Sequence, residues 1–413
     1  DLILEVAQSD SIPVDVYDMR LDKAVRLIRG PKGTEVRLTV KKVDGSTQVI
    51  PIIRDVVVIA ETYAKSLVIK QDGDSSNYGY IHLGSFYAEF GKRNGKRCSK
   101  DVLNQIESLK KSDVEGIVLD LRNNGGGSLS DAVDMVGYFI KYGPVVQVDG
   151  VGQEPQEYTD RDPDIQFKKP LVVMINNFSA SASEIFAAAI QDYNRGVIVG
   201  SNSFGKGTVQ RFFGLSAVAD QYGVHEDKKE LGDVKQTIAK FFRINGGATQ
   251  LKGVEPDVKL PDVYEHIEIG EKEYDHALAW SSIKPAAYQT FKFDFNIPNL
   301  QSNSQARLSE SEYFNSVKNY SKAIEKVNNE TVYPLAYKAF KNYKIKRKEE
   351  SEAFKVKEDS IKNWTVQLNK MDLYEAKSDT VLQKRLSKFV ESTSDDQYIR
   401  ESFKILSEMC SKE

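Results

Sequence analysis

The sequence predicts an α/β protein in which a central region of alternating strands and helices follows a small β/α module and precedes a mostly helical region. The central part alternates short apolar runs with helix-like segments, which is typical of parallel or mixed sheets. Beyond Gly270 there is no glycine, and after Pro298 the only proline is Pro334, which favours helices at the end of the chain. We therefore expect domains at residues 1–56, 57–265 and 266–413.

The first domain is expected to contain one helix and several strands. The helix is predicted by apolar residues on one face of a 3.6-residue repeat, Leu21, Ala24, Val25 and Ile28. Gly30 ends this helix, and the following "GPKGT" predicts a turn. Strand-like segments follow at residues 34–42 and 47–53.

The central domain is expected to have an α/β core with largely parallel or mixed strands. Short apolar runs predict strands at residues 79–86, 116–122, 169–177 and 196–200. Helical patterns lie between them at residues 99–112 and 183–193. Residues 217–233 predict a polar loop that interrupts this alternation. The last domain is rich in Lys, Glu, Ser and Ala, and its charge runs favour solvated helix faces over a specific docking surface.

Composition and charge exclude several classes of protein. The chain of 413 residues is 40% hydrophobic and 28% charged, and its net charge of −3 gives no support to nucleic-acid binding. No apolar stretch approaches the roughly 20 residues of a membrane span. The cysteines, Cys98 and Cys410, cannot form a disulfide framework, and no His or Cys cluster has zinc spacing. No signal peptide is visible and the first residues resemble the inside of a domain, so we expect a fragment or processed form.

The segment "VIVGSNSFGKGTVQ", residues 197–210, resembles a phosphate-binding loop at first sight. Such a loop requires Ser or Thr directly after its lysine, because that hydroxyl holds magnesium. Gly207 occupies this position and Thr208 comes one residue late, so the sequence argues against nucleotide binding. Alternatively, Lys206 is a surface lysine without a function, in a turn made by the neighbouring glycines.

A serine-rich turn precedes the helix predicted at residues 183–193. In "NNFSASASEIF", the serines Ser179, Ser181 and Ser183 alternate with alanine between a buried strand and a helix N-terminus. This placement suits a nucleophile, because the turn exposes a hydroxyl and free N–H groups at the helix start can stabilise an oxyanion. The alternative is that the serines are small turn and N-cap residues, which this stretch alone favours.

Three consecutive glycines in "LDLRNNGGGSLSDAV" lie between a predicted strand and a helix that Ser128 or Ser130 would cap. Consecutive glycines permit unusual backbone angles and can bring N–H groups close to a ligand. Alone, this motif is equally well explained as a flexible turn.

A serine hydroxyl is a poor nucleophile until a base takes its proton. The histidines lie away from these motifs in sequence, at His82, His225, His266 and His276, and we expect His82 to be a packed strand residue. A lysine can act as the base where burial lowers its pKa well below about 10.4. Lys206, between glycines and after an apolar strand, is the candidate.

Together these segments resemble the tail-specific, or C-terminal processing, serine protease family. The matching motifs occur in the order "LDLRNNGGG", "FSASASE", "FAAAIQDY" and "FGKGTVQ". The segment "RLDKAVRLIRGPKGTEVRLTV" resembles the second half of the family's PDZ domain, and "LKGVEPDVKLPD" resembles the end of its protease core. "GEKEYDHALAWSSI" and the helical tail resemble the larger Gram-negative branch. The resemblance implies a crotonase-like core built from β-β-α units.

The resemblance also implies roles for individual residues. Ser181 corresponds to the nucleophile, Lys206 to the general base and Gln210 to the residue that orients the lysine. Asp192 lies where this branch keeps an acidic residue in a supporting role. The oxyanion hole would consist of backbone N–H groups, from Ala182 and from Gly127 or, alternatively, Gly126.

The activity implied by this resemblance is endopeptidase cleavage through an acyl-enzyme, with no metal, nucleotide or other cofactor. The family relationship implies protein substrates chosen through C-terminal, usually apolar, residues, a periplasmic or otherwise extracytoplasmic location, and room for an adaptor protein. The chain begins after the place of the family's carboxylate-binding loop, so residues 1–56 resemble only the C-terminal half of a PDZ domain. The alternatives are a non-catalytic peptide-binding scaffold, with the tail as its interaction surface, and a nucleotide hydrolase.

Overall fold

The chain folds into two compact units, Asp1–Ala60 and Glu61–Glu413. The structure, a computed structural model, describes residues 1–55, 63–71, 76–89, 92, 95–152, 154–223, 231–292, 295–353, 356, 364–369, 372–373 and 380–411. The predicted boundary between residues 56 and 57 lies outside this described part of the chain. Of the helices in the described ranges, none is both long and apolar enough to cross a membrane.

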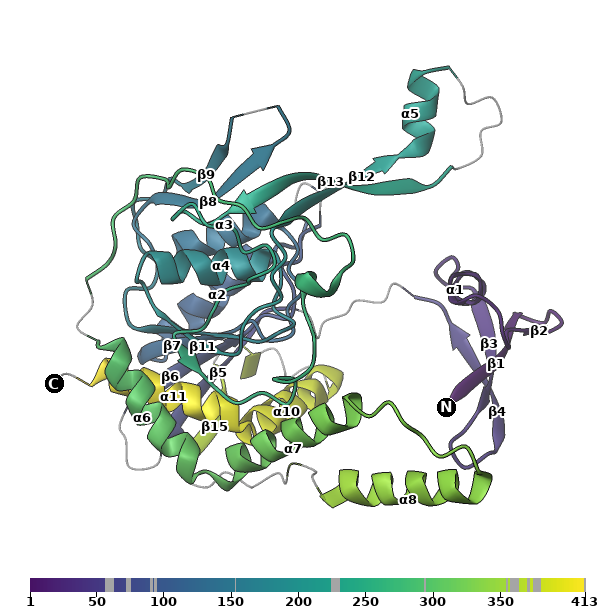
Figure 1. The fold of residues 1–413 in the computed structure, drawn as a ribbon. Helices are drawn as coiled ribbons and strands as arrows, with labels where there is room; N and C mark the ends of the chain where they lie inside the picture. Colours follow the sequence, from purple (N-terminus) through teal and green to yellow (C-terminus); the bar gives the residue numbers. More distant parts are fainter. Residues whose placement is uncertain are drawn as a thin grey trace. The chain divides into compact units, whose positions relative to one another are not determined.

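The first unit is a twisted antiparallel sheet accompanied by one helix (Figure 1). The strand order is β2-β1-β3-β4, with β1 at Leu2–Gln8, β2 at Val14–Asp15, β3 at Glu35–Lys41 and β4 at Thr47–Ile53. The helix α1 spans Leu21–Ile28. The helix and both strands expected after it are therefore confirmed.

A small apolar cluster holds this unit together. The buried residues Val6, Val36, Leu38 and Val40 come from β1 and β3. The helix contributes its C-terminal end to the cluster through Leu27 and Ile28, whereas Leu21 is 79% exposed. The half-PDZ assignment remains a prediction.

The second unit is organised around a mixed sheet with the strand order β14-β11-β10-β7-β6-β5-β15. In chain order these strands are β5 (Lys65–Gln71), β6 (Asn77–His82), β7 (Val114–Asp120), β10 (Leu171–Ile175), β11 (Val197–Gly200), β14 (Val258–Lys259) and β15 (Trp364–Leu368). From β14 to β6 neighbouring strands are parallel, and β5 and β15 continue the sheet in antiparallel pairs. The α/β expectation for the central region is confirmed.

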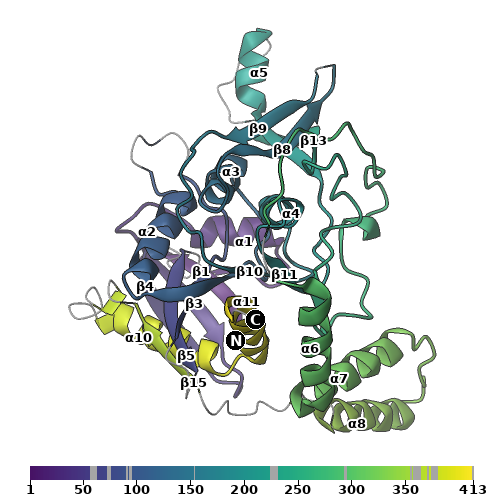
Figure 2. The ribbon, with the colours of Figure 1, turned by 90° about the vertical axis from the view of Figure 1, so that its left-hand side faces the viewer.

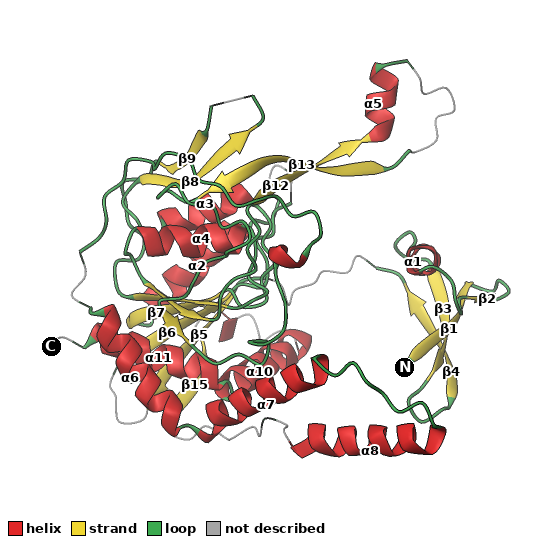
Figure 3. Cartoon of the chain, in the orientation of Figure 1, coloured by secondary structure: helices red, strands yellow, loops and turns green. Residues whose placement is uncertain are grey.

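Helices cover both faces of this sheet (Figure 3). One face carries α2 (Cys98–Lys110), α3 (Leu129–Gly137) and α4 (Ala182–Asp192), and the other carries α6 (Ile297–Glu310), α7 (Glu312–Asn328) and α11 (Gln397–Cys410). Along β10, Leu171, Val173 and Ile175 pack on the first face. Val172 and Met174 pack on the second. Burial on both faces explains why this strand is continuously apolar.

A smaller antiparallel sheet lies on the outer side of α3 and α4 (Figure 2). Its order is β12-β13-β8-β9, with β8 at Gly143–Gly150, β9 at Gln156–Asp160, β12 at Thr208–Gly214 and β13 at Asp233–Phe242. The hairpin of β12 and β13 carries the short helix α5, Leu215–Gln221. The predicted polar loop at 217–233 is therefore wrong at its start, and residues 224–230 lie outside the described residues.

The C-terminal region is mostly helical, as expected, and also includes α8 (Tyr337–Ala353) and α10 (Thr380–Ser394). The strand β15 was not predicted; it pairs with β5 and extends the sheet of the core. Its sequence "WTVQL" alternates large apolar and polar residues, a strand pattern that the helical composition around it conceals. The described residues between 271 and 292 have only a short 3₁₀ turn, Glu271–Glu273, so the helical expectation is wrong there.

Arg54 provides a test of what stabilises the first unit. The residue is 9% exposed, and its guanidinium donates to Ile28 O (2.8 Å) and Leu27 O (3.2 Å) at the end of α1, and to Gln8 Oε1 (2.6 Å). Arg54→Met should lower the free energy of unfolding of this unit by about 1.5–3 kcal/mol, because the hydrogen bonds of the charged guanidinium to these part-buried acceptors are lost. Faster amide exchange in β1 and β3 would measure the loss. Arg29→Met, at an exposed neighbour, is the matched control, and an equal effect in both would contradict the prediction.

Candidate active site

The candidate site forms where three neighbouring parallel strands, β11, β10 and β7, reach their carboxyl ends. After β7 the chain forms the glycine turn, residues 121–127, and after β10 it forms the serine turn, residues 176–181. After β11 it forms the lysine loop, residues 201–207, which contains Lys206. Carboxyl ends of adjacent parallel strands meet at one edge of a sheet, where α/β proteins commonly place their ligands. The fold therefore brings together the motifs that the sequence separates.

The serine turn places Ser181 at the corner between β10 and α4. Ser181 is the N-cap of α4 and has φ 57° and ψ −112°, a conformation that is sparsely populated for any residue with a side chain. Ser179 and Ser183 are fully buried, and their hydroxyls donate to Leu121 O and Asn124 O, each at 2.8 Å. Ser181 alone of these serines is partly exposed. A strained strand-to-helix corner of this kind presents a hydroxyl to a substrate.

Asn124 connects the glycine turn to the serine turn through hydrogen bonds. Its side chain donates to Leu83 O (2.8 Å) and accepts from Gly126 N (2.9 Å), while its carbonyl oxygen accepts from Ala180 N (3.0 Å). The helix that follows, α3, is capped by Ser128 rather than Ser130, since Ser128 Oγ accepts from Asp131 N.

Two of the glycines are required by geometry. Gly126 has φ +97°, and a Cβ there would lie 2.8 Å from Ser181 Cβ and 3.0 Å from Ala182 N. Gly127 has φ +143°, and a Cβ there would overlap with Phe86 O. The glycine turn is therefore packed against the start of α4, and only glycine permits this approach.

The lysine loop runs from β11 into β12, so no helix begins after it. A phosphate-binding loop needs a helix N-terminus at this point, and its absence here argues further against a nucleotide site. Lys206 is half-buried, and its Nζ donates to Gln210 Oε1 at 3.3 Å. Burial lowers the pKa of Lys206 from its usual value, and the nearby charge of Lys235 lowers it further.

Glu184 joins the serine turn to the lysine loop. Its fully buried carboxylate accepts from Ser181 N (2.7 Å) and Lys206 N (2.9 Å) through Oε2. Through Oε1 it accepts from Gly205 N (2.7 Å) and Ser203 Oγ (2.6 Å). Burial raises the pKa of Glu184 to about 7, against the opposing effect of these donors. The sequence analysis missed this residue, although the spacing Ser181-x-x-Glu184 is that of a capping box.

Two further hydrogen bonds fix the position of the lysine loop. Phe204 N donates to Ser179 O (2.9 Å), so the loop and the serine turn also share a backbone hydrogen bond. Gly207 N donates to Gln250 Oε1 (2.7 Å). In the part of the chain that the structure describes, no hydrogen bond joins Ser181 Oγ to Lys206 Nζ.

Asp192 lies at the opposite end of α4 from Ser181. Its carboxylate accepts from Arg243 (2.6 and 3.0 Å) and from Asn245 Nδ2 (2.8 Å). Burial raises the pKa of Asp192, and Arg243 opposes that shift. The helix of 11 residues separates Asp192 from Ser181 by about 16 Å at 1.5 Å per residue. The structure therefore connects the backbones of Ser181 and Lys206 through Glu184 and pairs Lys206 with Gln210, whereas Asp192 lies apart from them.

Two family models match most of the second unit. Residues 77–260 match the model described as "Peptidase family S41", and residues 264–411 match "C-terminal domain of tail specific protease". The first match contains all the site residues described above, and the second begins at residue 264.

Named relatives share this similarity over most of the chain. The tail-specific protease of Haemophilus influenzae is 43% identical over 289 residues, covering 70% of this chain and 39% of that protein. The carboxy-terminal-processing protease of Bartonella bacilliformis is 33% identical and covers 61% of this chain and 54% of that protein. The solved photosystem II D1 C-terminal processing protease aligns at 27% identity over 62% of each chain, with a TM-score of 0.41. The chain thus spans about half the length, or less, of these first two relatives.

Glu184 should make the free energy of unfolding of the second unit depend on pH. The pKa of about 7 in the folded protein lies above the ordinary value of 4.5, so the folded state retains a proton that the unfolded chain releases. The free energy of unfolding should therefore fall as pH rises from 4.5 to 7, by about 3 kcal/mol from this group. Denaturation followed by the fluorescence of Trp280 and Trp364, both in this unit, measures it.

Glu184→Gln removes the titrating group while the other carboxyl groups stay. Between pH 4.5 and pH 7 the unfolding free energy of the wild type should therefore change by about 3 kcal/mol more in the destabilising direction than that of this variant. Parallel pH curves for the two proteins would contradict the assignment.

Proposed function

The chain belongs to peptidase family S41, and from this membership we propose that it is a serine endopeptidase that cleaves protein substrates. One observation carries the proposal: the buried carboxylate of Glu184 accepts hydrogen bonds from the backbone N–H groups of both Ser181 and Lys206. A hydroxyl and an amine are thereby kept in adjacent, immobilised turns. The similarity to relatives named as tail-specific and C-terminal processing proteases supports the same activity.

In this proposal Ser181 is the nucleophile and Lys206 is the general base. Neutral Lys206 takes the proton of Ser181 Oγ, and Oγ attacks the carbonyl carbon of the scissile peptide. The Lys206 ammonium then returns the proton to the departing amine nitrogen. A water molecule, deprotonated by Lys206, hydrolyses the ester and restores both groups. Gln210, whose Oε1 accepts from Lys206 Nζ, keeps the amine oriented.

The oxyanion would be held by backbone N–H groups at the start of α4 and in the glycine turn. Ala182 N is the donor from α4. We assign the second donor to Gly127 rather than Gly126, because Gly126 N already donates to Asn124 Oδ1 (2.9 Å). Such preorganised donors stabilise developing negative charge without reorganising. Asp192, paired with Arg243, would support α4 from its far end and not touch the reacting groups.

The remaining features of the proposal follow from the family resemblance. The core would be crotonase-like, and residues 1–56 would form the C-terminal half of a PDZ-like domain, followed by a protease domain to residue 265 and a helical domain to residue 413. Substrates would be recognised through apolar C-terminal residues, with or without an adaptor, outside the cytoplasm.

Separate substitutions of the two reacting groups test the activity. Ser181→Ala and Lys206→Ala should each reduce cleavage of a protein with an apolar C-terminus by at least about 10⁴-fold, while circular dichroism shows an unchanged fold. A serine-reactive phosphonate probe should label the wild type and not Ser181→Ala. Substantial cleavage by either variant would reject the dyad, and an unlabelled wild type would favour a scaffold.

The glycine turn offers a second test with a matched pair of variants. In Gly126→Ala the new methyl group would approach Ser181 Cβ to 2.8 Å at φ +97°, so the corner must shift. Cleavage should fall by about 100-fold or more. Gly125→Ala introduces the same methyl group where no atom lies within 4 Å, and should retain activity. Equal activity of the two variants would contradict the packing described here.

A further inference from the structure

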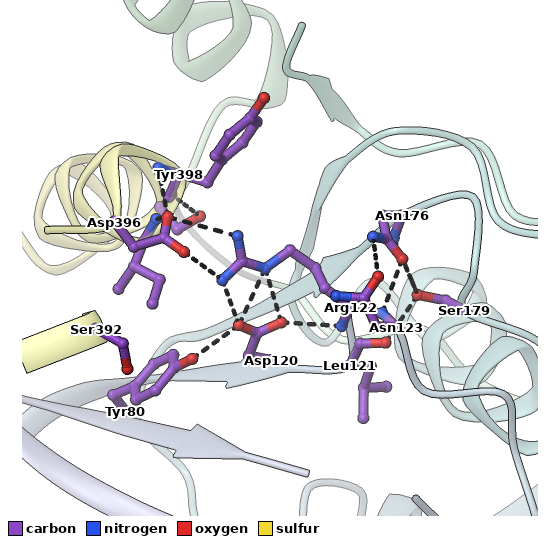
Figure 4. A network of polar contacts seen from close by, with 12 residues as sticks. Tyr80, Asp120, Leu121, Arg122, Asn123, Asn176, Ser179, Ser392, Asp396 and Tyr398 are labelled. Atoms are coloured by element: carbon purple, nitrogen blue, oxygen red, sulfur yellow. Dashed lines mark hydrogen bonds and ion pairs between the residues drawn. The ribbon is translucent and has the colours of Figure 1, made fainter. Parts of the chain in front are cut away.

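A polar network joins the C-terminal helical region to the glycine turn (Figure 4). Arg122, just past the end of β7, lies between two carboxylates. Its Nε donates to both oxygens of Asp120 at 3.0 Å, and its Nη2 donates to Asp120 at 2.6 Å and to Asp396 at 2.9 Å. Asp120 belongs to β7, whereas Asp396 directly precedes α11 at the end of the chain.

Asp396 is itself held rigidly. Its Oδ1 accepts from Tyr398 N (2.8 Å) and Ile399 N (3.0 Å), which caps the N-terminus of α11. The Tyr398 ring lies 5.8 Å from the Arg122 guanidinium, and its hydroxyl donates to Pro261 O (2.8 Å). The carboxylate that meets Arg122 is therefore fixed by a helix that packs on the sheet face opposite α4.

The residues next to Arg122 make direct contacts with the serine turn (Figure 4). Leu121 O accepts from Ser179 Oγ (2.8 Å). Asn123 N donates to Asn176 Oδ1, and Asn176 Nδ2 donates back to Asn123 Oδ1, both at 2.9 Å. The backbone beside Arg122 thus contacts both the start of the serine turn and the residue two places before Ser181.

The two ion pairs of Arg122 connect it to different parts of the chain. Asp120 is a near neighbour in sequence and 2% exposed, so its pair holds the guanidinium against the end of its own strand. Asp396 comes from a distant part of the chain, and its pair anchors the turn to a second, rigid element. The side chains of Arg122 and Asp396 are 19% and 24% exposed, which leaves their attraction only partly screened by solvent.

We propose that Asp396 is a positioning residue for the hydrolytic reaction. Through Arg122 it fixes the turn at residues 121–127. Through that turn it keeps Ser181 and the proposed oxyanion donors, the backbone N–H groups of Ala182 and Gly127, in fixed relative positions. The inference rests on the proposed function. It gives the C-terminal region a role in the chemistry besides packing against the core.

Asp396→Asn in the full chain separates the two roles of this carboxylate, the capping of α11 and the ion pair with Arg122. Asparagine caps helices as well as aspartate does, so α11 should remain intact, but the charge that meets Arg122 is lost. We expect kcat to fall roughly 10- to 100-fold with KM nearly unchanged, because the reacting groups are misplaced while substrate binding is preserved. The melting temperature should stay close to that of the wild type. Asp395→Asn, at the exposed neighbour, should have wild-type kinetics.

Hydrogen exchange provides a readout that does not depend on cleavage. In a Ser181→Ala background, Asp396→Asn should accelerate amide exchange at residues 123–127 and leave α2 unchanged. If the wild type cleaves nothing and exchange still accelerates, the proposed function fails and the coupling stands. Wild-type kcat in Asp396→Asn, unchanged exchange in the turn, or a failure of this variant to fold would each overturn the positioning role.

Discussion

The arrangement of the site depends on one buried carboxylate. Glu184 accepts hydrogen bonds from Ser181 N, Lys206 N, Gly205 N and Ser203 Oγ. Each of its two oxygens accepts two of these hydrogen bonds. Without this acceptor, buried donors from two separate segments would be left unsatisfied, at a cost of about 1–3 kcal/mol each. The serine turn and the lysine loop are therefore held together as a single structural element.

The parallel order of the strands explains why these segments meet at all. β10 lies between β7 and β11, so the serine turn has the glycine turn on one side and the lysine loop on the other. Each function is supplied by a different connection: N–H groups after β7, a hydroxyl after β10 and an amine after β11. The helices and the outer sheet bury this sheet and hold its edge in place.

Local patterns in the sequence were sufficient for four strands of the main sheet and for the helices on one of its faces, but not for β5, β14 or the smaller sheet. The continuous apolar run at Leu171–Ile175 and the helix after Ser181 follow from periodicity and capping alone. The strand at Trp364–Leu368 could not be predicted in this way, because it is defined by pairing with β5, far away in sequence. The roles of Glu184 and Asp396 were missed for the same reason. By sequence, Glu184 is the N3 residue of a capping box and Asp396 is an N-cap residue. The second partner of each lies on another segment and is brought near only by the tertiary fold.

Under the proposed mechanism, the backbone conformation of Ser181 sets stability against reactivity. At φ 57° a residue with a side chain is strained by about 1–3 kcal/mol, whereas glycine would adopt the same angles with little penalty. The amino acid that best suits the corner as architecture therefore lacks the hydroxyl that makes the corner useful. This position is an intrinsic stability–activity trade-off, in which a more robust protein would be an inert one.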